Sequence, residues 1–167
     1  MGAYGANEQS VRVLGLGNEI LADDAFGILA AREVRRRFGH RAEVVESSDA
    51  GFNLLDRLLG VSRLMVVDTI VTGAARPGTL RVFSADGWPP AASPAPHFTG
   101  LFEVLAVAEK LGLPVPREVT IVAVEAADCL TVGGAMHPDV YTAIPLAVDW
   151  VARFLKDAPC RTPEHSG

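Results

Sequence analysis

The chain is predicted to adopt an α/β fold with a mostly parallel sheet and an antiparallel fourth strand. Residues 11–16 form an almost continuous apolar run, which is typical of a central parallel strand covered on both faces. Further apolar strand patterns alternate with helical ones along the chain, as in folds built on parallel strands. A short turn precedes the fourth strand and reverses its direction. With 167 residues, 49% of them hydrophobic, we expect a single domain over residues 1–167.

The first strand leads through a glycine-rich corner into a helix. Gly15 and Gly17 allow a tight turn after the strand. Asp23 and Asp24 follow, where carboxylates can accept hydrogen bonds from the free amides of a helix start. Apolar residues then recur at every fourth position over residues 26–38. Residues 11–38 therefore predict a strand–corner–helix unit.

The middle of the chain continues the same alternation. It contains a strand at 42–47, a short leucine-rich helix at 54–59, a strand at 63–70 with Asp68 near its end, and a strand at 79–84. Residues 75–78, Ala-Arg-Pro-Gly, are a turn signal. Because only a hairpin is short enough to join the third and fourth strands, the fourth is expected to be antiparallel.

The second half of the chain supplies a helix at 99–111, a buried strand at 119–124 and a final helix at 139–155 that covers the sheet. If the last strand is parallel to the first three, the helix before it must start at the carboxyl edge of the sheet. The proline-rich loop 86–98 is expected to return the chain to this edge, and it places His97 immediately before the helix. His137, next to Pro138, is interpreted as a residue at a helix start, although it could also contact a substrate.

Three potential metal ligands thus share one edge of the predicted sheet: Glu19, Asp68 and His97. One imidazole and two carboxylates suit a borderline divalent ion such as nickel, zinc, manganese or iron, and they leave a coordination position open. Taken singly, Glu19 could be a carboxylate near a helix N-terminus, Asp68 a turn residue and His97 a helix cap. Their convergence on one edge favours a metal-contacting site.

Composition and motifs exclude several other classes of protein. The formal net charge of −5 argues against nucleic-acid or membrane-surface partners. Two distant cysteines indicate neither a disulfide framework nor a thiolate zinc site and fit a reducing cytoplasm. No secretory signal or membrane-spanning stretch is recognised, so we expect a soluble protein with mobile ends at 1–10 and 157–167. Glu19 and Ile20 interrupt a dinucleotide fingerprint, which leaves a nucleotide-binding module as a minor alternative.

The segment Gly15-Leu-Gly-Asn-Glu-Ile-Leu-Ala-Asp-Asp24 resembles the opening motif of the hydrogenase maturation endopeptidases. The resemblance covers most of the chain and continues through Val67-Asp-Thr69, Pro96-His-Phe-Thr-Gly-Leu101 and Val124-Glu125. It implies a three-layer α/β/α fold with a five-stranded mixed sheet whose fourth strand is antiparallel. It also implies that Glu19, Asp68 and His97 are metal-contacting residues.

The resemblance implies a peptide-bond hydrolase that trims the C-terminal extension of a nickel–iron hydrogenase large-subunit precursor. Nickel would be supplied by the precursor, and no organic cofactor is expected. No familiar protease signature is present in the sequence, so we interpret Asp68 as the residue best suited to proton transfer. The alternative is a nickel-dependent docking or chaperone protein that binds the precursor without cleaving it.

Overall fold

The structure, a computed structural model, describes residues 7–84 and 96–157, with side chains described for residues 10–84 and 100–157. Most of the predicted mobile ends and most of the loop 86–98 therefore lie outside the described residues. The strands are β1 (Asn7–Leu16), β2 (Glu43–Ser47), β3 (Val61–Ile70), β4 (Leu80–Ser84) and β5 (Glu118–Glu125). The helices are η1 (Ala22–Ala25), α1 (Phe26–Phe38), η2 (Gly51–Leu54), α2 (Leu55–Leu58), α3 (Pro96–Lys110), α4 (Pro138–Thr142) and α5 (Ile144–Lys156), where η marks a 3₁₀ helix.

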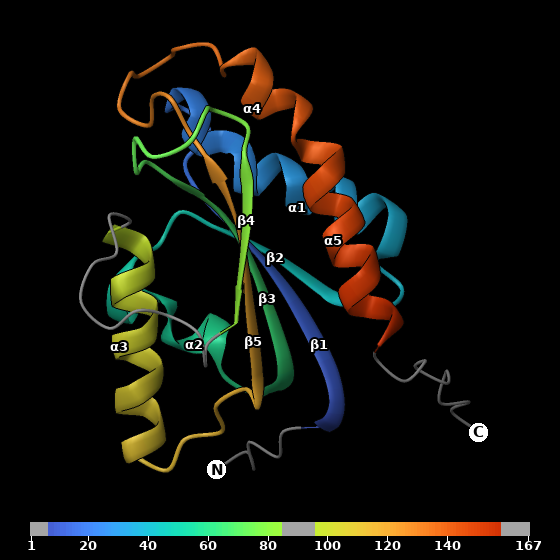
Figure 1. Ribbon diagram of the computed structural model, residues 1–167. Coiled ribbons are helices and arrows are strands. Elements are labelled where there is room, and N and C mark those ends of the chain that lie inside the picture. The colour runs from blue at the N-terminus through green and yellow to red at the C-terminus, as the bar shows by residue number, and fades with distance from the viewer. Residues whose placement is uncertain (1–6, 85–95, 158–167) are drawn as a thin grey trace.

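The strands of the described residues form one sheet in the order β2-β1-β3-β5-β4 (Figure 1). β4 is antiparallel to β5, and the other pairs are parallel, which confirms the predicted mixed sheet. The predicted hairpin between the third and fourth strands is wrong, because β5 lies between them. The connection at residues 71–79 is long enough to cross one strand position, since neighbouring strands lie only about 4.8 Å apart.

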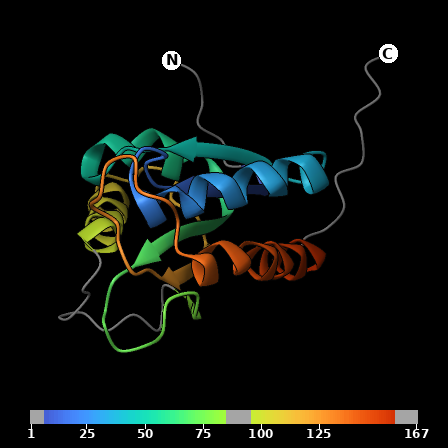
Figure 2. The ribbon, with the colours of Figure 1, turned by 90° about the horizontal axis from the view of Figure 1, so that it is seen from above.

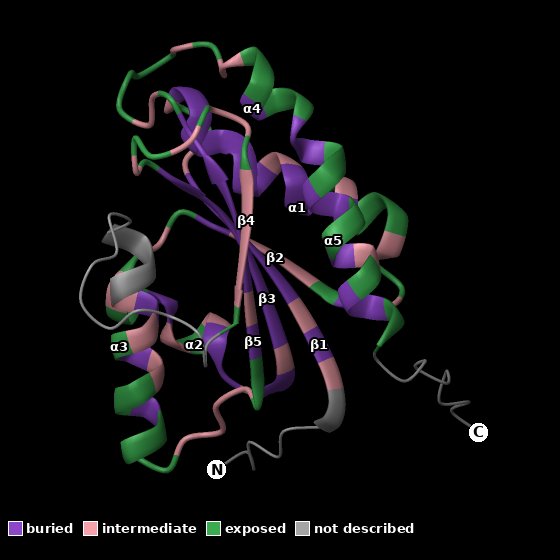
Figure 3. Cartoon of the chain, viewed as in Figure 1, coloured by how far each residue is buried: buried purple, intermediate pink, exposed green. Residues whose placement is uncertain are grey.

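Helices cover both faces of the sheet, which confirms the three-layer α/β/α architecture (Figures 1 and 2). Side chains alternate along β1, so that Val13 packs with α1 and α5 whereas Leu14 packs with α2 and α3. Figure 3 shows that the middle strands β3 and β5 are mostly buried, while β4 at the edge is mostly of intermediate exposure. Because β1, β2, β3 and β5 are parallel, their carboxyl ends lie at the same edge of the sheet.

The predicted strand–corner–helix unit is present as β1, η1 and α1. Gly27 lets α1 approach β1 closely, because a Cβ at this position would lie 2.0 Å from the carbonyl oxygen of Leu16. Gly17 has a φ of +148°, which L side chains rarely adopt, and a Cβ there would collide with the carbonyl oxygen of Asp24. These close contacts pack η1 and the start of α1 directly against the carboxyl end of β1.

Two helix starts differ from their predicted positions. α3 begins at Pro96 rather than at residue 99, because proline suits the first position of a helix. His97 is therefore inside the first turn of α3, and this turn lies at the carboxyl edge of the sheet because α3 leads into the parallel β5 (Figure 1). The C-terminal helical region is divided into α4 and α5, with Pro145 in the first turn of α5. Along the described ranges, no helix is long and apolar enough to cross a membrane.

Candidate active site

A cavity of about 510 Å³ opens where the parallel strands end. Its lining comes from the corner after β1, from the segment after β2, from the end of β3 and from the segment after β5. The lining residues include Asp24, Asp49, Thr69, Asp128 and Cys129. Ligands of open α/β sheets bind at this edge, and the volume is within the range of small-molecule and peptide sites. The cavity is therefore the candidate substrate site.

Asp68 is buried beside this cavity, in β3 next to the cavity residue Thr69. Only 1% of Asp68 is exposed, and its Oδ1 accepts a 2.7 Å hydrogen bond from the backbone N–H of Thr69. Its Oδ2 is buried and has no hydrogen-bond partner among the described residues. Burial raises the pKa of Asp68 well above the ordinary 3.8, and the nearby Asp24 carboxyl adds to this effect. Burial thus favours the protonated form of Asp68, which can release a proton.

Thr69 connects this carboxyl to two further groups at the cavity. Its hydroxyl donates a 3.1 Å hydrogen bond to Oδ1 of Asp24 and accepts a 3.6 Å hydrogen bond from the thiol of Cys129. Asp24 is 6% exposed, although it lines the cavity. Burial raises the pKa of the Cys129 thiol to about 11. Asp24 is therefore the carboxyl that the structure brings close to Asp68, and Cys129 is a poor thiolate nucleophile.

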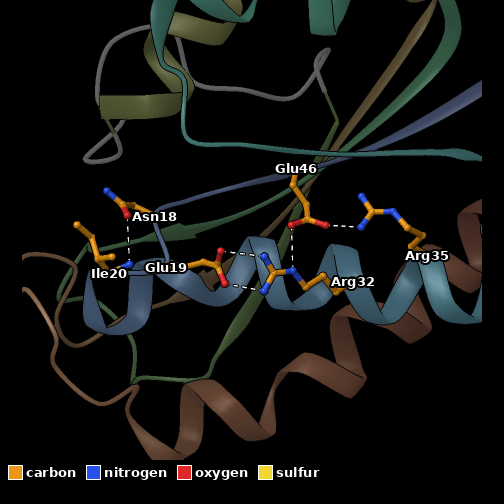
Figure 4. A network of polar contacts seen from close by, with 6 residues as sticks. All are labelled: Asn18, Glu19, Ile20, Arg32, Arg35 and Glu46. Atoms are coloured by element: carbon orange, nitrogen blue, oxygen red, sulfur yellow. Dashed lines mark hydrogen bonds and ion pairs between the residues drawn. The ribbon is translucent and has the colours of Figure 1, made fainter.

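Glu19, the first predicted metal ligand, lies at a neighbouring hollow of about 300 Å³. Both of its oxygens accept hydrogen bonds from Arg32, at 2.5 and 2.8 Å, and Arg32 also contacts Glu46 (Figure 4). This pairing lowers the pKa of Glu19 below its ordinary 4.5. The Glu19 side chain is 50% exposed and does not line the larger cavity. Gly17 and Asn18 line both hollows, so the two adjoin each other.

The third predicted ligand, His97, is placed only through its backbone. It stands in the first turn of α3, one helical turn before Leu101, while its side chain lies outside the described residues. Among the side chains that the structure describes, no three from histidine, cysteine, aspartate and glutamate are arranged to share a metal ion. The predicted set of Glu19, Asp68 and His97 therefore stays a prediction.

The glycine-rich corner is poorly suited to bind phosphate. Phosphate-binding corners present free backbone amides. Here the amides of Gly17 and Asn18 donate to the carbonyl oxygens of Ser47 and Asp24, at 3.1 and 3.2 Å. The amide of Ile20 donates to the side chain of Asn18. Because these donors are already satisfied inside the protein, the structure disfavours the alternative of a nucleotide-binding module.

Comparison of the sequence with known proteins identifies the family. The profile described as "Hydrogenase maturation protease" (HycI) matches residues 28–153. The chain belongs to the hydrogenase maturation protease family. The hydrogenase 2 maturation protease of Escherichia coli K12 is 27% identical over 152 residues, which cover 89% of this chain and 92% of that protein. The HupD hydrogenase expression/formation protein of Thiocapsa roseopersicina is 29% identical over 157 residues, covering 89% of this chain and 70% of that protein.

Solved structures agree with this assignment. The hydrogenase maturating endopeptidase HybD of E. coli superimposes with a TM-score of 0.72 at 28% identity, over 89% of this chain and 93% of HybD. A second endopeptidase from E. coli, solved in solution, gives a TM-score of 0.77 at 25% identity, over 94% of this chain and 99% of that one. The present maturation protease is accordingly an endopeptidase, as its resemblance to this family implied.

Two acidic residues of the maturation protease have roles that the sequence did not predict. Asp23 and Asp24 were expected to accept hydrogen bonds from the amides of a helix start, and this prediction is wrong. Neither η1 nor α1 has a side-chain cap. Asp24 instead accepts from Thr69 at the cavity, while Asp23 accepts from backbone amides that follow β5. Both residues are buried. The sequence feature that could have indicated their roles is the pair of adjacent acidic residues shortly after the glycine-rich corner.

Other predicted positions fit the structure of the maturation protease. His137 is the N-cap residue of α4, and its Nδ1 accepts a 3.2 Å hydrogen bond from the amide of Asp139, which confirms its place at a helix start. Glu125 is buried at the end of β5 and binds the backbone that follows β3. These residues shape the site without lining its cavity.

Proposed function

We propose that the protein removes the C-terminal extension of a nickel–iron hydrogenase large-subunit precursor after nickel insertion, and that it does so in the cytoplasm. Nickel belongs to the substrate in this proposal, and the protein contacts it through side chains at the carboxyl edge of the sheet. Membership of the maturation protease family supports the reaction class. The relatives that the chain matches carry names that refer to hydrogenase maturation or formation.

The observation that carries the proposed chemistry is the buried Oδ2 of Asp68, which has no hydrogen-bond partner among the described residues. Asp68 directly precedes Thr69, which lines the cavity. Burial favours the protonated carboxyl of Asp68 in the free protein, and this carboxyl can donate its proton to the departing amide nitrogen. The resulting carboxylate can then contact the substrate's nickel or accept a proton from water. The cavity beside it is large enough for a short peptide segment. Asp68 is therefore our candidate for proton transfer during cleavage.

The position of α3 supports His97 as a partner of Asp68. Since side chains alternate along a strand, Asp68 belongs to the same face of β3 as Val66 and Ile70. Both of these residues pack in one cluster with Leu101 of α3. His97 precedes Leu101 by four residues, which places it on the adjacent turn of the same helix.

The second carboxylate at the substrate's metal has two candidates. Glu19 was predicted from the sequence, but in the free protein it is held by Arg32 at the adjoining hollow. Asp24 lines the main cavity and is linked to Asp68 through Thr69. This geometry favours Asp24, and a role for Glu19 requires that substrate binding displace Arg32.

The test is the intact mass of a nickel-loaded precursor before and after incubation with the protein. Wild-type protein should release a C-terminal peptide from the nickel-loaded precursor and leave the nickel-free precursor intact. The variants Asp68→Asn and His97→Ala should abolish release. Comparison of Asp24→Asn with Glu19→Gln decides which carboxylate contributes, because each replacement removes one negative charge at nearly constant shape.

Glu33→Gln is the matched control for Glu19→Gln. Glu33 is also bound by an arginine, Arg36, on the surface of α1, but it does not line either hollow. Replacement of the Glu33 carboxylate should leave processing of the precursor unchanged. Tight binding of the precursor without peptide release under any nickel condition would instead identify a docking or chaperone protein.

A further inference from the structure

The carboxylate of Asp23 binds the segment that follows β5. Its Oδ2 accepts hydrogen bonds from the amides of Ala127 and Asp128, at 2.7 and 2.9 Å, and its Oδ1 accepts one from the amide of His137 at 2.6 Å. The backbone amide of Asp23 donates in return to the carbonyl oxygen of Asp128, at 2.8 Å. Asp23 is only 1% exposed, so these charge-assisted hydrogen bonds are shielded from water.

The segment held in this way is a wall of the cavity. Residues 127–130 line the cavity, and they are neither helix nor strand. Apolar packing contributes little to their position, since the side chain of Leu130 points into solvent and the residue is 85% exposed. Further hydrogen bonds run from the amide of Gly133 to Ile20 and from the amide of Ala22 to Thr131. The wall and the stretch 131–133 that follows it are thus held mainly by hydrogen bonds to residues 20–23, and Asp23 makes the largest number of them.

We propose that Asp23 is a positioning residue that fixes this wall for the peptide substrate. The inference rests on the proposed function, because it assigns a substrate to the cavity. Asp23 does not line the cavity, so it acts through residues 127–130 rather than on the reacting atoms. It is also the neighbour of Asp24, and the same short helix therefore sets the wall and one carboxyl of the site. Loss of the wall should weaken substrate binding more than it slows the chemical step.

The first test is Asp23→Asn, assayed with nickel-loaded precursor at several concentrations. The amide nitrogen of asparagine cannot accept a hydrogen bond, so the variant loses the hydrogen bonds to at least one of the two oxygens of Asp23. We expect KM to rise about tenfold, while kcat stays within about threefold of wild type. Hydrogen exchange at residues 127–137 should become faster. An unchanged KM, or a loss confined to kcat, would overturn the proposal.

A second pair of variants leaves Asp23 in place. His137→Pro removes the amide that donates to Oδ1 of Asp23, at a φ of −59° that suits proline. His137→Asn keeps this amide and supplies a good N-cap for α4. Asp23 holds the loop 127–137 at both ends, through Ala127 and Asp128 at one end and through His137 at the other. The proposal therefore requires a raised KM for His137→Pro and a normal KM for His137→Asn, and equal values for the two would contradict it. If wild-type protein cleaves no precursor, the proposed function fails, whereas cleavage with an unaltered KM in both Asp23→Asn and His137→Pro refutes only the positioning role.

Discussion

The hydroxyl of Thr69 donates a 3.1 Å hydrogen bond to Oδ1 of Asp24 and so joins the end of β3 to the short helix η1. The backbone amide of Thr69 donates at the same time to Oδ1 of Asp68. A single residue therefore contacts both buried carboxyls of the candidate active site. Because Thr69 is only 4% exposed, its conformation depends little on solvent.

Replacement of Thr69 by valine should remove the contact to Asp24 and keep the contact to Asp68. Valine keeps the shape and the backbone amide but removes the hydroxyl, which leaves the buried Asp24 carboxyl without this donor. We expect a loss of about 1–3 kcal/mol in the free energy of unfolding and a roughly tenfold lower kcat/KM for processing. Urea unfolding and a time course of precursor mass measure the two effects. Thr69→Ser, which restores the hydroxyl, should recover most of both, and a serine variant as impaired as the valine variant would argue against this role.

The raised pKa of Asp68 predicts a specific dependence of stability on pH. In the unfolded chain an aspartate loses its proton near pH 4, whereas folded Asp68 retains its proton at higher pH. The contribution of Asp68 to stability is therefore complete below about pH 4 and declines as the pH rises through the folded pKa. Asp68→Asn imitates the neutral carboxyl and should lack this decline.

Comparison of the two proteins isolates the effect, since their other titrating groups are the same. Near pH 7.5 we expect Asp68→Asn to be more stable than wild type, and near pH 4 the difference should be small. Thermal unfolding at both pH values measures this difference in stability. The precursor assay checks that Asp68→Asn has lost processing activity. Parallel pH profiles for the two proteins would show that Asp68 is not held neutral by burial.

The sequence predicted the fold well because the strands have strong, local apolar patterns. The direction of β4 and the start of α3 at the carboxyl edge followed from connection lengths and from the parallel β5. Local patterns cannot show which strand is inserted between two others, so the position of β5 between β3 and β4 was missed. The insertion depends on contacts between distant residues, such as the hydrogen bonds that Glu125 makes with Thr72 and Gly73.

The same limitation applies to the candidate site. Asp68 was recognised because a carboxylate near the end of a buried strand is unusual. Glu19 and Asp24 both follow the same corner, and their spacing in the sequence does not reveal which one faces the cavity. The turn of η1 directs Asp24 toward Thr69, while Arg32 of α1 holds Glu19 at the neighbouring hollow. These orientations depend on tertiary contacts that become visible only in the structure.

The thiol of Cys129 should react slowly with alkylating reagents. A pKa of about 11 leaves roughly 0.1% of the thiol ionised at pH 8, compared with about a quarter of an ordinary cysteine. In a Cys160→Ser background, we expect iodoacetamide to modify Cys129 at least about tenfold more slowly than free cysteine. Mass spectrometry follows the reaction, and unfolding in urea should accelerate it. Rapid modification of the folded protein would reveal an activated thiolate and reopen a cysteine-based mechanism.

Glu125 should be essential for the connection between β3 and β4. Its Oε1 accepts from the amides of Thr72 and Gly73, at 2.7 and 2.9 Å, and its Oε2 accepts from the hydroxyl of Thr72 at 2.7 Å. Glu125 is 1% exposed, so removal of its side chain leaves these donors without their buried acceptor. We expect Glu125→Ala to lower the free energy of unfolding by roughly 2–4 kcal/mol.

Glu125→Gln is the matched control, because its carbonyl oxygen can accept from both amides and its NH₂ group can donate to the hydroxyl of Thr72. We expect it to remain within about 1 kcal/mol of wild type. Urea unfolding gives the free energies, and hydrogen exchange at residues 72 and 73 should be fast in the alanine variant alone. If alanine and glutamine have equal effects, the connection is held by other contacts. A selective loss in the alanine variant would show that this carboxylate stabilises the chain as it crosses β5 to reach the edge strand β4.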